Sequence, residues 1–301
     1  MSRARAEPAP IRSRAALPAV PGAIWLLFFL VLPLLCIAAI SFLTRGDAGE
    51  VAGRFTTGNY KRLLGFGLLG FDPLYPQILL RSLAIGFASA ACCLGAALPM
   101  AFFIASLPGR WKNLALTLVV IPFWTNLLIR TYAWQLLLGP ESPLSKVAAG
   151  AGFIASGDGL HPGMTAVMIG MVCDFLPFMV LPLYASVEKL DWTLAEAAAD
   201  LGANAWNVFR HALLPQLWPG LAAGFLLVFL PATGQFVIPD LLGGAKTLLL
   251  GNVIQQQFGP SRDWPFGAAI ATTALALVLA GMWLHARIAR ATVEREEGVL
   301  G

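Results

Sequence analysis

The chain has 301 residues, of which 58% are hydrophobic and only 12% are charged, whereas about 25% of the residues of an ordinary soluble domain are charged. Its mean hydropathy is +0.74, so the apolar residues are too many to be hidden in one core. These values exclude a soluble globular protein and indicate a chain solvated by lipid. The net charge of +4 comes from basic residues scattered between hydrophobic runs, which argues against a nucleic-acid partner.

The amino-terminal residues 1–21 are rich in Arg, Ala and Pro and are predicted to form a disordered cytoplasmic tail. The apolar run 22–44 follows, and it is long enough to cross a bilayer, which requires about 20 apolar residues. Because the run lacks an obvious small-residue cleavage site, we expect a retained anchor and not a removed signal peptide. Positive charge just before a span favours the cytoplasmic side, and this tail carries Arg3, Arg5, Arg12 and Arg14.

Residues 45–80 are predicted to form an external loop, and five further apolar runs follow it. With the first span they predict an all-α membrane protein of six transmembrane helices, with both termini in the cytoplasm and 291–301 as a cytoplasmic tail. The cysteines all lie inside apolar runs without metal-ligand spacing, so we expect neither a disulfide nor a bound metal. The five later runs are 82–107, 113–138, 162–187, 212–239 and 264–286, and the cysteines are Cys36, Cys92, Cys93 and Cys173.

The segment 188–216, between the fourth and fifth spans, is predicted to form two helices joined by a tight turn. Thr193 and Glu196 have the spacing of a capping box, and Gly202 suits the left-handed turn that ends a helix. Asn204 is a good cap for a second helix that Pro215 is expected to stop. We therefore expect a helix-turn-helix that projects from the membrane.

Trp206, Phe209 and Leu213 give the second helix one apolar face. An amphipathic pair lying flat on the membrane surface would bury the same aromatic rings. A flat surface helix does not require a hard turn at Gly202 followed by a second apolar face, whereas insertion into a partner's groove does. We therefore favour docking into a partner.

The same segment resembles the EAA loop of ABC-importer permeases. Glu196, Ala197 and Ala198 are followed after three residues by Gly202, and after nine more by the run that ends in Leu214 and Pro215. The resemblance implies that this loop forms the coupling helices, which sit in a cleft of a cytoplasmic ATPase. It covers roughly 81–290, the transmembrane domain, and implies a type I ABC importer fold.

Several further segments resemble the spermidine and putrescine (polyamine) permeases within that family. The resemblance implies a subunit of the bacterial inner membrane that forms half of a translocation path and works with an ATPase dimer, a second, related permease and an external solute-binding protein. It also implies that ATP and magnesium are bound by the ATPase, with no cofactor in this subunit. The segments are 126–134, 177–184, 236–244 and 262–265.

The chain contains no convincing catalytic constellation. A phosphate-binding loop needs Gly-x-x-x-x-Gly-Lys followed by Ser or Thr, and the run 243–247 fails this pattern because Ala245 separates Gly244 from Lys246. His161, His211 and His285 fall near span ends without a matching acid or nucleophile. We therefore assign no catalytic residue and expect ATP hydrolysis in a separate subunit.

Two charges fall inside predicted spans. A carboxylate such as Asp174 costs at least about 2.5 kcal/mol near the middle of a bilayer and is expected to face a cavity or a partner. It is therefore either a ligand along a cation path or half of an ion pair with a cation such as Arg130 that locks helices together. Arg130 would repel a cationic solute, so we assign it to structure or gating, with snorkelling as the simplest account.

Other residues are candidates for the solute path. Tyr184 and Trp134 offer ring faces to an alkylammonium group, although membrane belts use the same residues. Gln235 stands where many polyamine permeases carry Glu, and Asp240 is expected on the external side together with Asp263. Gly234, between Pro231 and Pro239, is expected to loosen the fifth span and to take part in gating.

Other functions are open at this stage. An importer of an opine, an amino-acid derivative or an inorganic ion would share the coupling loop and most of the helices. An ion-coupled secondary transporter would usually show repeated halves, and we see none in the sequence. An intramembrane enzyme would need a paired acid and base at membrane depth.

Overall fold

The computed structural model describes residues 20–46, 49–67, 70–155, 157–244 and 248–299. The chain divides into two compact units, one formed by 64–256 and the other by 1–63 together with 257–301. The predicted disordered tail lies outside the described residues except at its last two positions.

The unit 64–256 is helical apart from one short hairpin. Two antiparallel two-residue strands, β3 (Phe66–Gly67) and β4 (Gly70–Phe71), precede its helices. The helical elements in chain order are α4 (Leu74–Ser106), α5 (Gly109–Val120), the 3₁₀ turn η3 (Ile121–Trp124), α6 (Leu127–Leu138), α7 (Pro143–Gly150), α8 (Met164–Val187), α9 (Trp192–Asp200), α10 (Ala205–Val208), the π-helical turn η4 (Phe209–Leu213), α11 (Leu214–Gly234), α12 (Val237–Leu242) and α13 (Leu250–Phe258).

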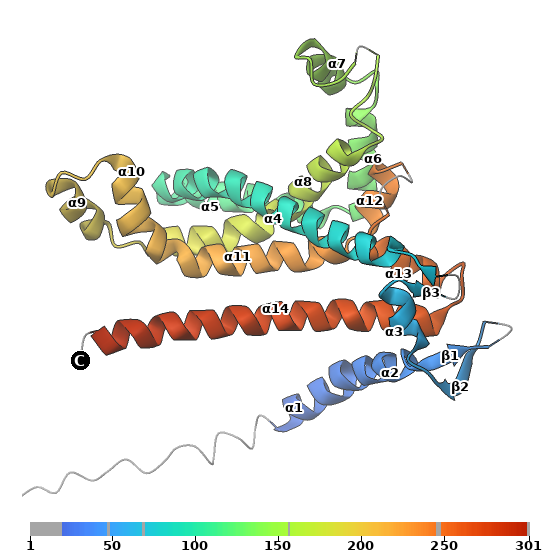
Figure 1. Ribbon diagram of the computed structural model, residues 1–301. Coiled ribbons are helices and arrows are strands. Elements are labelled where there is room, and N and C mark those ends of the chain that lie inside the picture. The colour runs from blue at the N-terminus through green and yellow to red at the C-terminus, as the bar shows by residue number, and fades with distance from the viewer. Residues whose placement is uncertain (1–19, 47–48, 68–69, 156, 245–247, 300–301) are drawn as a thin grey trace, which may run out of the picture. The chain divides into compact units, whose positions relative to one another are not determined.

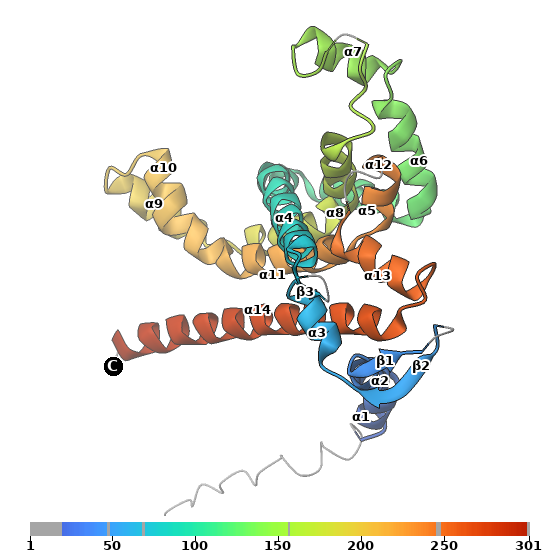
Figure 2. The same cartoon turned by 45° about the vertical axis from the view of Figure 1, so that its right-hand side comes forward.

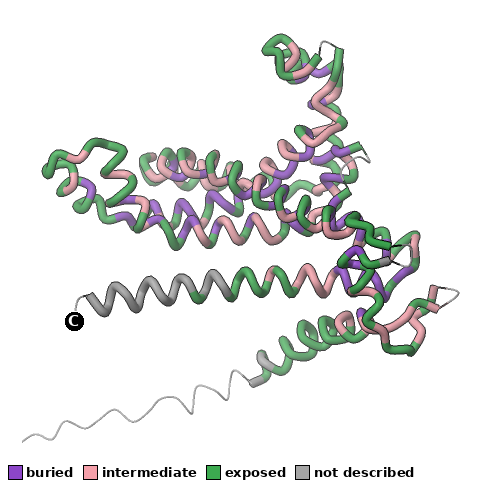
Figure 3. The backbone as a smooth tube through the Cα atoms, in the orientation of Figure 1, coloured by how far each residue is buried: buried purple, intermediate pink, exposed green. Residues whose placement is uncertain are grey.

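Three long helices, α4, α8 and α11, pack against one another and form the core of this unit (Figure 1). Their facing sides are buried while their outer sides remain exposed, as Figure 3 shows. Helices in lipid gain little from hydrophobic burial and associate through small residues that allow close approach. Most of the buried face of α4 has this composition, with Ser82, Gly86, Ser89, Ala90, Cys93, Ala97 and Ala101 beside the larger Ile78, Ile85 and Ile104.

Glycines set the distance between α8 and α11. A β-carbon at Gly220 would clash with the Ser186 side chain and lie 2.9 Å from the Pro182 carbonyl oxygen. A β-carbon at Gly224 would lie 2.8 Å from the Met179 sulfur. This part of α11 can therefore pack on α8 only without side chains at these positions.

The run 113–138, predicted as the third span, is not one continuous helix in the structure. The stretch Gly109–Trp124 and the helix Leu127–Leu138 meet at an angle of 96°. Pro122 begins the 3₁₀ turn, and Asn126 starts a new helix because its side chain accepts a hydrogen bond from Leu128 N at 2.8 Å. The apolar pattern of the run gave no sign of this bend, because no charged residue interrupts it between Lys112 and Arg130.

The unit formed by 1–63 and 257–301 contains the predicted first and last spans. The first is the run α1 (Val20–Leu26), the π-helical turn η2 (Leu27–Val31) and α2 (Leu32–Ile40), followed by the antiparallel strands β1 (Leu43–Arg45) and β2 (Val51–Phe55) and by α3 (Gly58–Leu63). The last is α14 (Trp264–Val299), which continues through most of the predicted carboxy-terminal tail. The predicted external loop is thus a folded structure.

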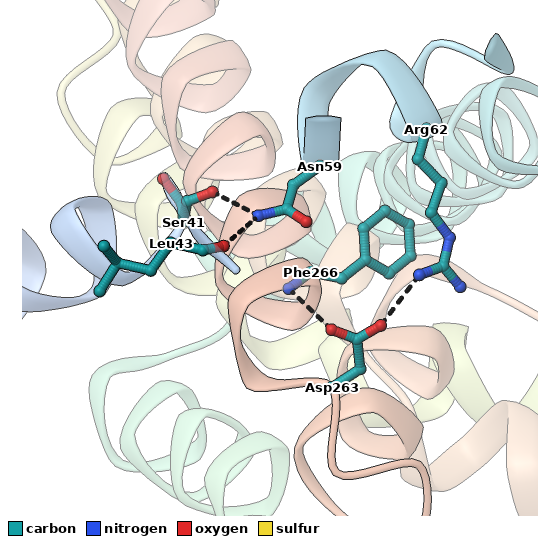
Figure 4. Close-up of polar contacts among 6 residues, drawn as sticks. All are labelled: Ser41, Leu43, Asn59, Arg62, Asp263 and Phe266. Carbon is teal, nitrogen blue, oxygen red and sulfur yellow. Dashed lines mark hydrogen bonds and ion pairs between the residues drawn. The ribbon is translucent and has the colours of Figure 1, made fainter. Parts of the chain in front are cut away.

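Polar contacts hold this loop to the ends of the two spans (Figure 4). Asn59 Nδ2 donates to the carbonyl oxygens of Ser41 and Leu43 at 2.8 and 2.9 Å. Arg62 pairs with Asp263 at 2.9 Å, and its guanidinium lies 4.0 Å from the centre of the Phe266 ring. The carboxylate of Asp263 is therefore engaged within the protein.

Four described helices are long and apolar enough to cross a membrane, and the bent pair raises the number to five if it forms one span. The first run contributes a shorter apolar helix, Ile24–Ile40. The predicted helical membrane architecture is thus confirmed, with two short hairpins added to it, while the count of six spans stays a prediction.

Candidate functional site: the coupling segment and the membrane-depth polar residues

The coupling segment, residues 188–216, forms the predicted pair of helices, α9 and α10. The predicted capping box is wrong by two positions, because the cap of α9 is Asp191 and not Thr193. Asp191 Oδ1 accepts from Thr193 N at 3.0 Å and from Thr193 Oγ1 at 2.6 Å. The hydroxyl and the backbone N–H of Thr193 hold the pKa of the Asp191 carboxyl below its ordinary value. An aspartate before Trp-Thr was the available signal, since Asp is as good a cap as Thr.

The turn between α9 and α10 has the predicted geometry. Gly202 has φ of +85°, a left-handed conformation, and Asn204 Oδ1 accepts from Asn207 N at 2.9 Å. Pro215, in contrast, does not stop the second helix. The π-helical turn η4 precedes it, so Pro215 occupies the first turn of α11, where a missing N–H costs little, and the helix continues into the membrane as Ala205–Gly234.

The outer surface of the coupling segment is apolar at its tip. Leu201 is 89% exposed and Trp206 is 65% exposed. Glu196 and Ala197 are exposed on α9, and Ala198 is half-buried. The predicted apolar face of the second helix divides, because Leu213 is buried beneath α9 while Trp206 faces outward and stacks on Phe209 at 5.9 Å between ring centres.

The base of the segment is fastened to the bundle by contacts that the sequence did not suggest. Asp191 N donates to Gln216 Oε1 at 3.0 Å, across 25 positions of the chain. Lys112, near the start of α5, pairs with Glu188 at 3.2 Å, and the Phe102 and Trp192 rings lie edge to face at 6.4 Å. None of these pairs is close in sequence, so no local pattern announces them.

At membrane depth the structure pairs the two charges that the sequence singled out. Arg130 and Asp174 form an ion pair between α6 and α8, and Asp174 is only 8% exposed. Arg130 also donates to the Pro122 carbonyl oxygen at 2.7 Å, which lies in the 3₁₀ turn of the bent pair. Snorkelling of Arg130 to the membrane surface is therefore the wrong account, because the side chain points into the protein.

The remaining path candidates do not gather around Asp174. Tyr184 is buried near the coupling end of α8, where Lys112 Nζ lies 5.9 Å from its ring centre. Trp134 is half-buried on α6 and contributes to the edge of the core, and Asp240 is exposed on α12. These residues lie on separate elements rather than in one pocket.

The fifth span breaks at Gly234, where the sequence predicted that it would be loosened. Helix α11 ends at Gly234, and Gln235 Oε1 accepts from the N–H groups of Phe236 and Val237 at 3.0 and 3.2 Å. The side-chain amide oxygen of Gln235 is thus used to start α12. Asn252 Nδ2 donates to the Phe236 carbonyl oxygen at 3.0 Å, and Gly251 packs directly on Gly234.

Helices α6 and α12 lie side by side at this end of the bundle (Figure 2). Gln135 Nε2 donates to the Leu241 carbonyl oxygen at 2.6 Å, and Gly163 N donates to the Leu242 carbonyl oxygen at 3.0 Å. The broken ends of the third and fifth spans are therefore covered by protein groups, as backbone at membrane depth requires.

Comparisons with known proteins agree with this architecture. A family model described as the binding-protein-dependent transport system inner membrane component matches residues 97–294. The spermidine/putrescine transport system permease protein PotB of Escherichia coli (strain K12) is 45% identical over 275 residues, which cover 90% of this chain and 98% of that protein. The protein of the same name from Haemophilus influenzae is 43% identical over 258 residues, which cover 85% of this chain and 88% of that protein.

Solved structures share the fold. A chain of the bacterial ABC transporter involved in the import of the acidic polysaccharide alginate gives a TM-score of 0.67 at 16% identity, covering 91% of this chain and 95% of that one. A chain of the MetNI methionine ABC transporter gives 0.53 at 19% identity, covering 71% and 94%. The fold is that of type I ABC importer permeases, and the chain belongs to the family of inner membrane components of binding-protein-dependent transport systems, with a role in transport and not in catalysis.

Proposed function

We propose that this chain is one of two permease subunits of an ATP-driven bacterial importer, and that its coupling segment docks in a cleft of a cytoplasmic ATPase. The observation that carries this proposal is an apolar tip, Leu201 and Trp206, held out on a turn whose backbone ends are capped. Exposed apolar side chains on a rigid element are typical of a surface that inserts into a partner's groove. The partner ATPase binds the ATP and magnesium, and both termini of the permease lie in the cytoplasm.

Co-purification tests the docking. The permease co-expressed with its ATPase is expected to retain it, whereas Glu196→Arg and Gly202→Trp are expected to lose it. Glu141→Arg is the matched control, because Glu141 is an exposed glutamate outside the coupling segment. Retention of the ATPase by both coupling variants would overturn the proposal.

Labelling tests the orientation. A single cysteine at Asp200, in a chain whose own cysteines are replaced by serine, is expected to react with a membrane-impermeant maleimide only after the membrane is opened. Reaction in intact spheroplasts places the turn on the external side and excludes an ATPase partner.

The solute is a polyamine in this proposal, delivered by an external binding protein to a path between this permease and a second, related one. The support is the 45% identity to a spermidine/putrescine permease over almost its whole length. A thermal-shift screen of the cognate binding protein is expected to respond to spermidine and putrescine. A response only to an opine, an amino-acid derivative or an inorganic ion replaces the polyamine by that solute.

Within the subunit we assign Arg130 and Asp174 to a lock between α6 and α8, and Gly234 to the hinge of α11. Asp174 already has a cationic partner, so its availability to a solute requires that Arg130 move away. Tyr184, Trp134, Gln235 and Asp240 stay candidates for contacts along the path. Unchanged polyamine uptake by an assembled Asp174→Asn transporter removes Asp174 from the cation path.

A further inference from the structure

The side chain of Gln216 closes the base of the coupling segment. Its Oε1 accepts from Asp191 N at 3.0 Å, and its Nε2 reaches the Asp191 carbonyl oxygen at 3.5 Å and the Ala212 carbonyl oxygen at 2.8 Å. One carboxamide thus bridges both backbone groups of the residue that caps α9. The bridge joins the first turn of α11 to the root of α9.

This position links the two long helices on either side of the segment. Helix α8 ends at Val187, immediately before the root of α9, and α11 begins at Leu214. Beneath the bridge, Leu190, Ala195 and Leu213 are buried and fill the space between α9 and the start of α11. Apolar packing is not directional, so it holds these elements together without fixing their relative orientation. Hydrogen bonds are directional, and the carboxamide that both accepts from and donates to Asp191 fixes that orientation.

Helix α11 connects this base to the break in the fifth span. It runs for 21 residues from Leu214 to Gly234, about 30 Å at 1.5 Å per residue. Its far end is the hinge at Gly234, where α12 begins after Gln235. A displacement of the base of the coupling segment therefore moves one continuous helix, whose other end is the break at Gly234.

We propose that Gln216 is a positioning residue for energy coupling: it makes a movement of the docked α9 displace α8 and α11 together. Without the bridge, α9 is linked to α11 only by the apolar packing of α9 on the residues just before α11 and by the turn at Gly202 with the short α10. ATP would then be hydrolysed with less movement at the Gly234 hinge. This inference rests on the proposed docking of the coupling segment on an ATPase.

The test uses the full importer in proteoliposomes, with loaded binding protein outside and ATP inside. Gln216→Met keeps the length of the side chain and removes its hydrogen-bonding groups. We expect this variant to retain the ATPase, and the loaded binding protein to stimulate ATP hydrolysis as in the native importer. The amount of solute transported per ATP hydrolysed is expected to fall about fivefold, which corresponds to the loss of one or two hydrogen bonds. Gln216→Glu keeps the acceptor for Asp191 N, so its solute transported per ATP hydrolysed is expected to fall less.

Gln77→Met is the matched control, because Gln77 is an exposed glutamine at the start of α4, outside the coupling segment. A ratio of solute to ATP in Gln216→Met equal to that of the control overturns the inference. Loss of the bound ATPase by a monodisperse Gln216→Met permease also overturns it, because the bridge would then shape the docking surface. Failure of the docking proposal is recognised separately, by retention of the ATPase in both Glu196→Arg and Gly202→Trp.

Discussion

The two ends of the α4–α8–α11 bundle satisfy the hydrogen-bonding groups of the backbone in different ways. At each end, helices stop and leave backbone groups without partners. At the coupling end these groups are satisfied by short local caps, Asp191 and Asn204, on a segment whose tip is exposed. At the opposite end, Gly234, Gln235 and the bent third span are covered by other parts of the protein.

The difference follows from the solvent at each end. The coupling end can use water and brief side-chain caps, so its outer surface is free to carry apolar residues for a partner. The opposite end has broken backbone that is covered by protein, where an unsatisfied polar group costs several kcal/mol. The first end leaves apolar side chains exposed, as the proposed docking on an ATPase requires, and the second end covers a broken helix with other parts of the protein.

The largest expected effect comes from the buried charges of the covered end. Asp174→Ala leaves Arg130 without its anionic partner and is expected to lower stability by about 3–5 kcal/mol. Thermal unfolding of the purified permease in detergent measures the loss. The double variant Arg130→Met with Asp174→Leu is expected to recover most of it, and equal stability of Asp174→Ala and the native chain would show that the pair does not lock α6 to α8.

The helix contact between the two ends comes next. Gly220→Leu forces a side chain against Ser186 and the Pro182 carbonyl oxygen and is expected to cost about 1–3 kcal/mol or to separate α8 from α11. Gly95→Leu is the control, because a β-carbon at Gly95 meets nothing within 4 Å. The same melting experiment compares them, and similar losses would remove the close contact as an explanation.

At the coupling end, the turn at Gly202 is expected to affect ATPase binding only through its backbone conformation. A β-carbon at Gly202 meets nothing within 4 Å, but φ of +85° disfavours side chains. Gly202→Ala is therefore expected to weaken ATPase binding by about 1 kcal/mol, or fivefold, with less loss for Gly202→Asn. Titration of the permease with the ATPase measures this, and equal affinities would mean that the turn rearranges freely.

The smallest effect is expected from the exposed pair at the base of the coupling segment. The Tyr184 hydroxyl and the Lys112 ammonium lower the pKa of Glu188 below its ordinary value of 4.5. A carboxyl with a lowered pKa stabilises the fold fully above pH 4.5 and loses this contribution as the pH falls through the folded-state value. Glu188→Gln is therefore expected to reduce slightly the dependence of stability on pH at acid pH, as measured by thermal unfolding across a pH series. High salt is expected to have the same effect on the native chain.

Much of the coupling segment was predictable from the sequence because its structure is local. Gly202 and Asn204 act on residues within three or four positions, and such capping and turn geometry is a property of the chain itself. The capping box was assigned to Thr193 instead of Asp191 because two good caps stand two residues apart. The break at Gly234 was predictable for the same local reason, with a glycine between two prolines.

The sequence by itself determined that the chain is a membrane protein, which stretches are apolar and where the coupling turn falls. These features depend only on composition and on interactions between residues close in the chain. Only the tertiary structure decided that the third span bends by 96°, that Arg130 meets Asp174, and that Gln216 reaches Asp191. Each of these depends on groups far apart in the chain, and their pairing is set by how the helices pack against one another, which no local pattern specifies.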